Sequence, residues 1–113
     1  MQNKERYVDA QSIGLSITDL TKIQSVFARF PALSKVWLYG SRAKGNFRSY
    51  SDIDITLEGD ALNPDIGHRI EWALDDLYLP YTFDVSILTA IDNRDLLEHI
   101  ERVGVLIYEQ GDK

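Results

Sequence analysis

The sequence of 113 residues contains no cysteine, which excludes disulfides and thiolate-bound zinc or iron–sulfur clusters. A chain without disulfides is compatible with a reducing cytoplasm. The longest apolar runs fall far short of the ~20 residues that a membrane helix needs. Residues 1–14 are polar and mixed in charge and show no signal peptide. These absences predict a soluble, cytoplasmic protein with no membrane partner.

Positive charge is scarce over the chain as a whole, which has a net charge of −6. Binding to duplex nucleic acid needs a basic face that displaces counterions, so we expect no duplex nucleic acid partner. Arg42, Lys44 and Arg48 nevertheless fall within seven residues of one another. A local cationic loop in an acidic chain is typical of a site for one small anion.

The chain also lacks repeats, low-complexity stretches and long linkers, which indicates one domain. We expect residues 1–17 to form an N-terminal arm, residues 18–108 the domain and residues 109–113 a tail. Apolar spacing predicts helices over 18–30, from Pro64 to about Leu77, and over 92–103 with Asp92 as N-cap; β-rich runs predict strands over 35–39, 52–57, 82–88 and 105–108. This order predicts an α/β (α+β) fold with a mixed four-stranded sheet flanked by helices.

A Gly-Ser turn follows the first predicted strand at Gly40 and Ser41. Gly40 lets the backbone turn sharply and lets a phosphate approach the main chain. Ser41 can supply a hydroxyl and an N–H to phosphate oxygens, with further N–H groups if a helical turn starts here. Arg42 adjoins the turn and its planar guanidinium fits phosphate oxygens, so we expect it to bind a phosphate. Lys44 and Arg48 fit phosphate steering and ordinary loop charge equally well.

The spacing of Gly40 and Gly45 matches the first half of a P-loop. A P-loop continues with Lys and then Ser or Thr after its second glycine. Here Asn46 and Phe47 follow instead, so the P-loop is excluded.

Three aspartates occupy two predicted strands. Asp52 and Asp54 are two residues apart, so both point to one face of a strand. Oxygen ligands of this kind suit Mg²⁺, which is commonly held by one or two carboxylates plus substrate phosphates. Asp84 is the only charged residue of its apolar strand and is costly there unless it is paired, hydrogen-bonded or metal-bound. If the two strands are neighbours, the three carboxylates suit two Mg²⁺ ions and attack by a hydroxyl on a nucleotide phosphate.

The histidines give a weaker signal. His68 and His99 each lie alone on a predicted helix beside its apolar stripe. We interpret both as surface or half-buried histidines rather than as metal ligands or bases. Trp72 lies away from the stripe of its helix, which fits a protein interface and a plain exposed residue equally well.

The order of Gly40-Ser41, ten further residues, Asp52-x-Asp54 and a later strand Asp84 resembles the nucleotidyltransferase signature of the DNA polymerase beta superfamily. The short chain is similar to the minimal nucleotidyltransferases, or MNT domains. The resemblance implies the nucleotidyltransferase fold, with Gly40 and Ser41 as the phosphate-binding turn. It also implies Asp52 and Asp54 as metal ligands and Asp84 as the third acid.

Members of that family commonly act as antitoxins of HEPN-domain toxins, and some transfer AMP from ATP to a tyrosine of the toxin. The resemblance covers about residues 18–108 and implies ATP as substrate, Mg²⁺ or Mn²⁺ as cofactor, a HEPN-domain partner and a hetero-oligomer. One alternative is a non-catalytic module that neutralises a partner by contact alone. Another is transfer to a small-molecule hydroxyl, which is less expected because relatives of that type carry an additional helical domain for the acceptor.

Overall fold

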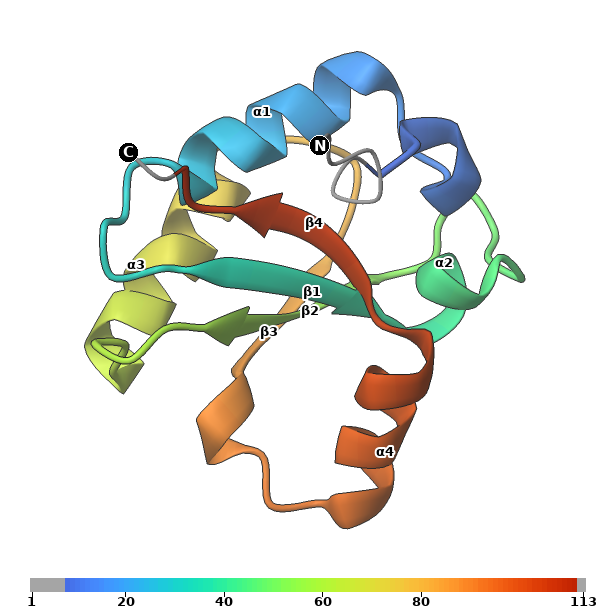
Figure 1. The fold of residues 1–113 in the computed structure, drawn as a ribbon. Helices are drawn as coiled ribbons and strands as arrows, with labels where there is room; N and C mark the ends of the chain where they lie inside the picture. Colours follow the sequence, from blue (N-terminus) through green and yellow to red (C-terminus); the bar gives the residue numbers. More distant parts are fainter. Residues whose placement is uncertain (1–7, 112–113) are drawn as a thin grey trace.

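The computed structural model describes residues 8–111, which form a sheet of four strands packed against helices (Figure 1). In chain order the elements, with η for 3-10 helices, are η2 (Ala10–Ile13), α1 (Ile17–Phe27), β1 (Lys35–Tyr39), α2 (Gly40–Lys44), β2 (Ile53–Glu58), α3 (Pro64–Asp75), β3 (Phe83–Ile87), η3 (Leu88–Ala90), α4 (Arg94–Val103) and β4 (Val105–Glu109). Within residues 8–111 no helix is long and apolar enough to cross a membrane.

The strands stand in the order β3-β2-β1-β4. β1 runs antiparallel to both β2 and β4, whereas β2 and β3 are parallel. The chain returns from β2 to β3 through α3, because two parallel strands cannot be joined by a tight hairpin. The predicted mixed four-stranded sheet is confirmed.

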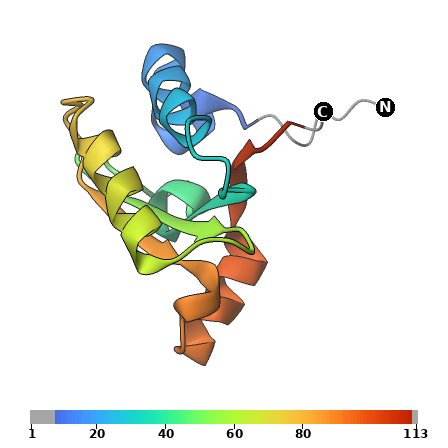
Figure 2. The same cartoon turned by 90° about the vertical axis from the view of Figure 1, so that its left-hand side faces the viewer.

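Alternation along the central strands separates the hydrophobic core from a second face of the sheet. Val36 and Leu38 of β1 are fully buried in the cluster that α1 and α3 cover on one side of the sheet (Figure 2). Trp37 and Tyr39 alternate with them and therefore point to the opposite face. There the Tyr39 ring meets the ring of His99 from α4 edge-on. The candidate site residues of β2 lie on this second face, because Ile53 and its core-facing neighbours occupy the first.

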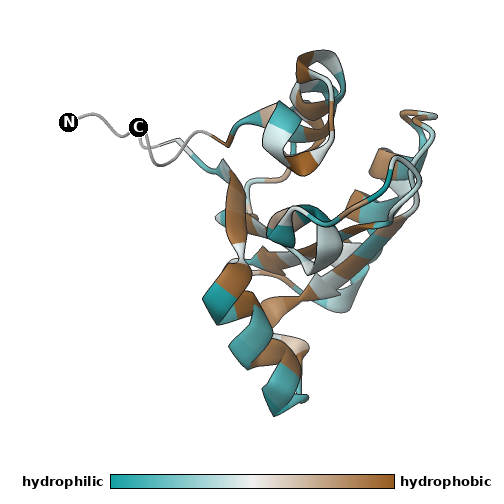
Figure 3. Cartoon of the chain, turned by 90° about the vertical axis from the view of Figure 1, so that its right-hand side faces the viewer, coloured by the Kyte–Doolittle hydropathy of each residue, from teal (hydrophilic) through white to brown (hydrophobic). Residues whose placement is uncertain are grey.

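The amphipathic helix α4 covers part of the second face, and its polar and apolar stripes are visible in Figure 3. Leu97 and Ile100 line a cavity together with Trp37 of β1. Glu98 is exposed on the outer side of the helix. α4 packs on β1 and also contacts α2, the short helix that begins with the Gly-Ser turn.

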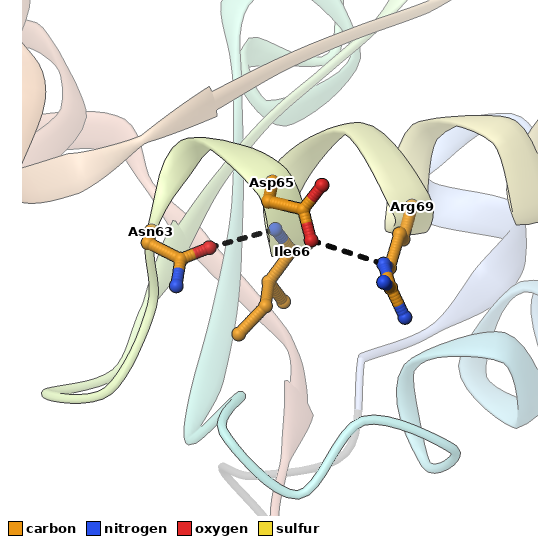
Figure 4. A network of polar contacts seen from close by, with 4 residues as sticks. All are labelled: Asn63, Asp65, Ile66 and Arg69. Atoms are coloured by element: carbon orange, nitrogen blue, oxygen red, sulfur yellow. Dashed lines mark hydrogen bonds and ion pairs between the residues drawn. The ribbon is translucent and has the colours of Figure 1, made fainter.

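Side-chain caps fix where the helices begin. Asn63 accepts a hydrogen bond of 2.9 Å from the Ile66 N–H, and Asp65 in the first turn pairs with Arg69, four residues on, at 3.1 Å (Figure 4). α3 therefore starts at Pro64, as predicted. Such caps satisfy N–H groups that have no partner within the helix.

The other two predicted helix starts were displaced by one or two residues. α1 is capped by Ser16 and starts at Ile17, and it ends at Phe27 rather than at residue 30. α4 is capped by Asn93 instead of Asp92. In each case a neighbouring polar residue of similar capping strength takes the position.

The predicted N-terminal arm differs from the structure over its described part. Ala10, Ile13 and Leu15 are buried in the hydrophobic core. The segment forms η2 and is held by the Leu15 N–H, which donates to the Ala10 carbonyl at 3.0 Å. The domain therefore includes the chain from at least Ala10 onward, whereas residues 1–7 of the predicted arm lie outside the described residues.

Candidate active site

Asp54 and Asp84 stand opposite each other on neighbouring strands. β2 and β3 pair in parallel with Asp54 in register with Asp84, so both carboxylates project from the second face of the sheet. Asp54 is half-buried and Asp84 is exposed. Asp52 directly precedes β2 and is exposed as well. The fold thus brings together the three acids that the sequence placed on two separate strands.

Burial and the two neighbouring acids perturb Asp54. The pKa of Asp54 is raised from 3.8 to about 6, mainly by burial and further by the charges of Asp84 and Asp52. Ionisation of Asp54 therefore adds a half-buried negative charge beside those of Asp84 and Asp52. A bound cation relieves this repulsion, so a cluster of neighbouring carboxylates has the electrostatic character of a metal site.

The Gly-Ser turn lies directly beside Asp54. β1 ends at Tyr39, which pairs with Asp54 across the sheet, and the chain then turns into α2. Gly40 has a φ of 76°, a left-handed conformation that side chains rarely adopt, and a Cβ at this position would overlap the Asp54 Oδ2. The backbone of the turn therefore approaches the carboxylate as closely as a glycine permits. Ser41 follows at the second position of α2, half-buried.

The structure gives Arg42 a role other than the predicted phosphate contact. Its side chain is fully buried, and all five of its N–H groups are used. They donate to four backbone carbonyls, those of Ile13, Gly14, Ser49 and Ser51, at 2.9–3.3 Å. No N–H remains for a phosphate, so the prediction for Arg42 is wrong in this structure.

Aromatic rings complete the surroundings of Arg42. The guanidinium carbon lies 5.5 Å from the centre of the Phe47 ring and 5.1 Å from that of Tyr81. The Tyr81 hydroxyl in turn donates to Asp19 of α1 at 2.8 Å. Arg42 thus ties the loop before Asp52 to the N-terminal segment. Its sequence position beside the Gly-Ser turn could not reveal this, because the carbonyls of Ile13 and Gly14 come from a distant segment of the chain.

Two cations remain exposed in the loop. Lys44 lies in the last turn of α2, and Arg48 lies between α2 and β2. Both side chains are open to solvent, so both are available to an approaching anion. The backbone N–H of Arg48 donates to Ser51 Oγ at 2.8 Å, which shapes the loop just before Asp52.

His99 is a site residue that the sequence did not indicate. The Gly40 N–H donates to His99 Nε2 at 3.1 Å, and the two residues are 59 positions apart. A lone histidine beside the apolar stripe of a helix carries no signal of this contact. The contact arises because the fold places α4 at the end of β1, next to α2 (Figure 1).

The three aspartates fit a metal ion that also takes ligands from phosphate oxygens. Among residues 8–111 no three His, Cys, Asp or Glu side chains converge on a common point suited to one ion. Mg²⁺ does not need three, because one or two carboxylates with phosphate oxygens are its usual ligands. The mutually repelling pair Asp54 and Asp84, with Asp52 beside it, supplies that donor set.

The whole arrangement defines the class of the protein: a Gly-Ser turn packed against Asp54 of β2, Asp52 just before that strand, which starts one residue later than predicted, and a third aspartate on the parallel neighbour. The chain belongs to the polymerase beta nucleotidyltransferase family, whose model matches residues 21–113. The resemblance predicted from the sequence is confirmed at this level, and the chain is a nucleotidyltransferase by family.

One relative narrows the type of nucleotidyltransferase that the chain resembles. The chain is 28% identical over 93 residues to the probable protein adenylyltransferase MntA of Haemophilus influenzae. The match covers 81% of each of the two chains.

Solved structures share the fold. A chain of a toxin–antitoxin crystal structure with AMP-PNP has a TM-score of 0.65 at 22% identity, covering 80% of this chain and 73% of that chain. A chain of the tri-AMPylated Shewanella oneidensis HEPN toxin in complex with MNT antitoxin has a TM-score of 0.61 at 19% identity, covering 82% and 71%. These likenesses establish the nucleotidyltransferase fold predicted from the motifs.

Proposed function

We propose that this chain transfers AMP from ATP to a hydroxyl group of a partner protein in the cytoplasm. The observation that most supports the proposal is the register of Asp54 with Asp84, with Gly40 packed against the Asp54 carboxylate. The similarity to the probable protein adenylyltransferase of Haemophilus influenzae favours adenylyl transfer over transfer of another nucleotide.

Each site residue has a part in binding the nucleotide. Asp52 and Asp54 would hold a Mg²⁺ or Mn²⁺ ion together with phosphate oxygens, and Asp84 would join them on a second ion. When bound, such ions neutralise phosphate charge and stabilise the attacking and leaving oxygens. Gly40 and Ser41 form the phosphate-binding turn: Gly40, which has no Cβ, lets the main chain lie against the Asp54 carboxylate, and Ser41 offers its hydroxyl. Lys44 is exposed and attracts the triphosphate to the turn.

The transfer is an in-line displacement at the α-phosphorus. The acceptor oxygen forms a bond to this phosphorus while the bond to the oxygen that bridges the α- and β-phosphates breaks. The hydroxyl proton passes to Asp84, and pyrophosphate leaves. Asp84 is exposed on β3, the edge strand of the sheet, so a hydroxyl carried by another protein can reach it.

The partner we propose is a HEPN-domain toxin, with this chain as its antitoxin in a hetero-oligomer. Support comes from the solved complexes of the same fold, one of which contains a tri-AMPylated HEPN toxin. The exposure of Asp84 at the edge of the sheet is consistent with an acceptor that arrives on a second protein.

Co-expression with a HEPN-domain toxin as the proposed partner tests the proposal in cells. The wild-type chain should neutralise the toxin, and the double variant Asp52→Asn/Asp54→Asn should not, because it removes charge with little change of shape. Asp60→Asn, an exposed acid in the turn after β2, is the matched control and should neutralise fully.

The same experiment separates transfer from neutralisation by contact. If the double variant is folded and still neutralises the toxin fully, the chain acts by contact alone. Labelled ATP and Mg²⁺ added to the purified pair should label the toxin; absence of label with both proteins folded rules out transfer to this partner.

A further inference from the structure

His99 contacts the nucleotide-binding turn from an element outside the motif. The Gly40 N–H donates to His99 Nε2 at 3.1 Å. On its other side Gly40 lies against the Asp54 carboxylate, so closely that no Cβ fits between them. The turn is therefore held between the imidazole of α4 and the carboxylate of β2.

The contact replaces a missing helix cap. Tyr39 occupies the N-cap position of α2 and makes no side-chain cap hydrogen bond. The first N–H groups of a helix have no partner inside it, and one that is partly buried needs another acceptor. His99 supplies this acceptor for Gly40, across the boundary between two helices.

The imidazole is suited to this task in one protonation state. To accept a hydrogen bond, Nε2 must carry a free lone pair, so the ring is neutral with its proton on Nδ1. The Tyr39 ring meets the imidazole edge-on, with ring centres 6.1 Å apart and planes at 83°, which fixes the ring plane. His99 is half-buried, so water competes weakly for the lone pair.

We propose that His99 is a positioning residue of the nucleotidyltransferase site. Its imidazole holds Gly40, and with it Ser41, at the distance from Asp54 that a phosphate requires. The expected effect of His99 on AMP transfer rests on the proposed function. This role makes α4 part of the active-site scaffold, although that helix carries none of the motif residues.

Three variants test the inference. His99→Leu keeps a side chain of similar size but removes the acceptor, whereas His99→Gln restores an acceptor through its Oε1. His68→Leu is the matched control, because His68 is exposed on α3 and stacks on Trp72. ATP binding with Mg²⁺ is measured by calorimetry, AMP transfer by label on the partner, and hydrogen exchange of the Gly40 amide by NMR.

We expect His99→Leu to expose the Gly40 amide to rapid exchange and to weaken ATP binding roughly three- to tenfold, the effect of one hydrogen bond. Transfer should fall at least as much, and His99→Gln should recover most of both losses. His68→Leu should match the wild type. In the wild type, the NMR signals of the imidazole should show a neutral ring protonated at Nδ1.

A folded His99→Leu protein with wild-type nucleotide affinity and Gly40 exchange would overturn the inference, as would a wild-type ring protonated at Nε2. Failure of the proposed function has a different signature. In that case the wild type transfers no label, while the exchange and calorimetry of the His99 variants still decide the role of His99.

Discussion

Gly40 and Asp54 are in direct contact at the ends of two antiparallel strands, and the contact leaves no room for a Cβ on Gly40. The motif glycine therefore has two physical reasons to be glycine: its left-handed φ of 76° and the carboxylate beside it. A phosphate bound at the turn lies next to the acids that would hold its metal. This proximity is the basis of the site.

Gly40→Ala should reduce AMP transfer by about a hundredfold, since displacement of the turn from Asp54 misplaces the phosphate relative to the metal ligands. Gly45→Ala is the matched control. Gly45 also has a left-handed φ, of 87°, but a Cβ there meets nothing within 4 Å. Both variants carry the backbone strain, so equal losses of transfer would contradict a specific role for the Gly40 contact.

Asp54→Asn should stabilise the metal-free protein at pH 7.5 by about 1 kcal/mol, after allowance for solvent screening of a partly exposed carboxylate. The pKa of Asp54 is raised from 3.8 to about 6. Between these values the folded state binds more protons than the unfolded state, so stability falls as the pH rises and stays low above the folded pKa. Urea unfolding at pH 7.5 and at pH 4 measures this. The stabilisation should nearly vanish at pH 4; a destabilisation at pH 7.5 would contradict the raised pKa.

Magnesium with ATP should raise the melting temperature of the wild type by about 5 °C near saturation, through preferential binding to the folded state. The rise should be absent in Asp52→Asn and in Asp54→Asn, and EDTA should remove it from the wild type. Because ionised Asp54 is the better ligand, the apparent affinity for Mg²⁺ should fall as the pH drops from 7 to 5. An affinity independent of pH over this range would exclude Asp54 as a ligand.

Arg42→Leu should destabilise the fold by about 3 kcal/mol or more, because it removes a fully buried side chain and leaves four backbone carbonyls, among them the buried one of Ile13, without their donor. Arg42→Lys should restore little, since an ammonium cannot reproduce five donors in one plane. Arg48→Leu is the surface control and should change stability by less than about 0.5 kcal/mol. Thermal unfolding of the three variants decides between this structural role and a role in phosphate binding, where Arg42→Leu would lower ATP affinity without loss of stability.

The sequence was sufficient for the strands and for the acids on them. Apolar alternation around Asp54 and Asp84 indicates which face of a strand their carboxylates occupy. Only the structure shows that the two strands are parallel neighbours with these residues in register. The Gly-Ser turn and the Asp-x-Asp strand also indicated the family. All of these signals are local, because each depends on residues a few positions apart.

The remaining features depend on contacts between distant segments. The position of Arg42 beside the Gly-Ser turn predicts a phosphate ligand, yet its donors are used by carbonyls as remote as that of Ile13. His99 looked like an ordinary helix residue because its partner Gly40 lies 59 positions away. The buried residues of η2 were assigned to an arm for the same reason, since a short apolar segment shows no period long enough to reveal its packing.

We expect the Asp54 carboxylate, together with the opposing Asp84, to carry adenylyl transfer to a partner protein. The decisive measurement is the intact mass of the HEPN-domain partner after incubation with ATP, Mg²⁺ and this chain. The wild type and Asp60→Asn should each add one or more AMP groups, and Asp54→Asn should add none while remaining folded. A partner that gains the same mass with Asp54→Asn would exclude a role of Asp54 in transfer, and a partner that gains none with the folded wild type would exclude transfer itself.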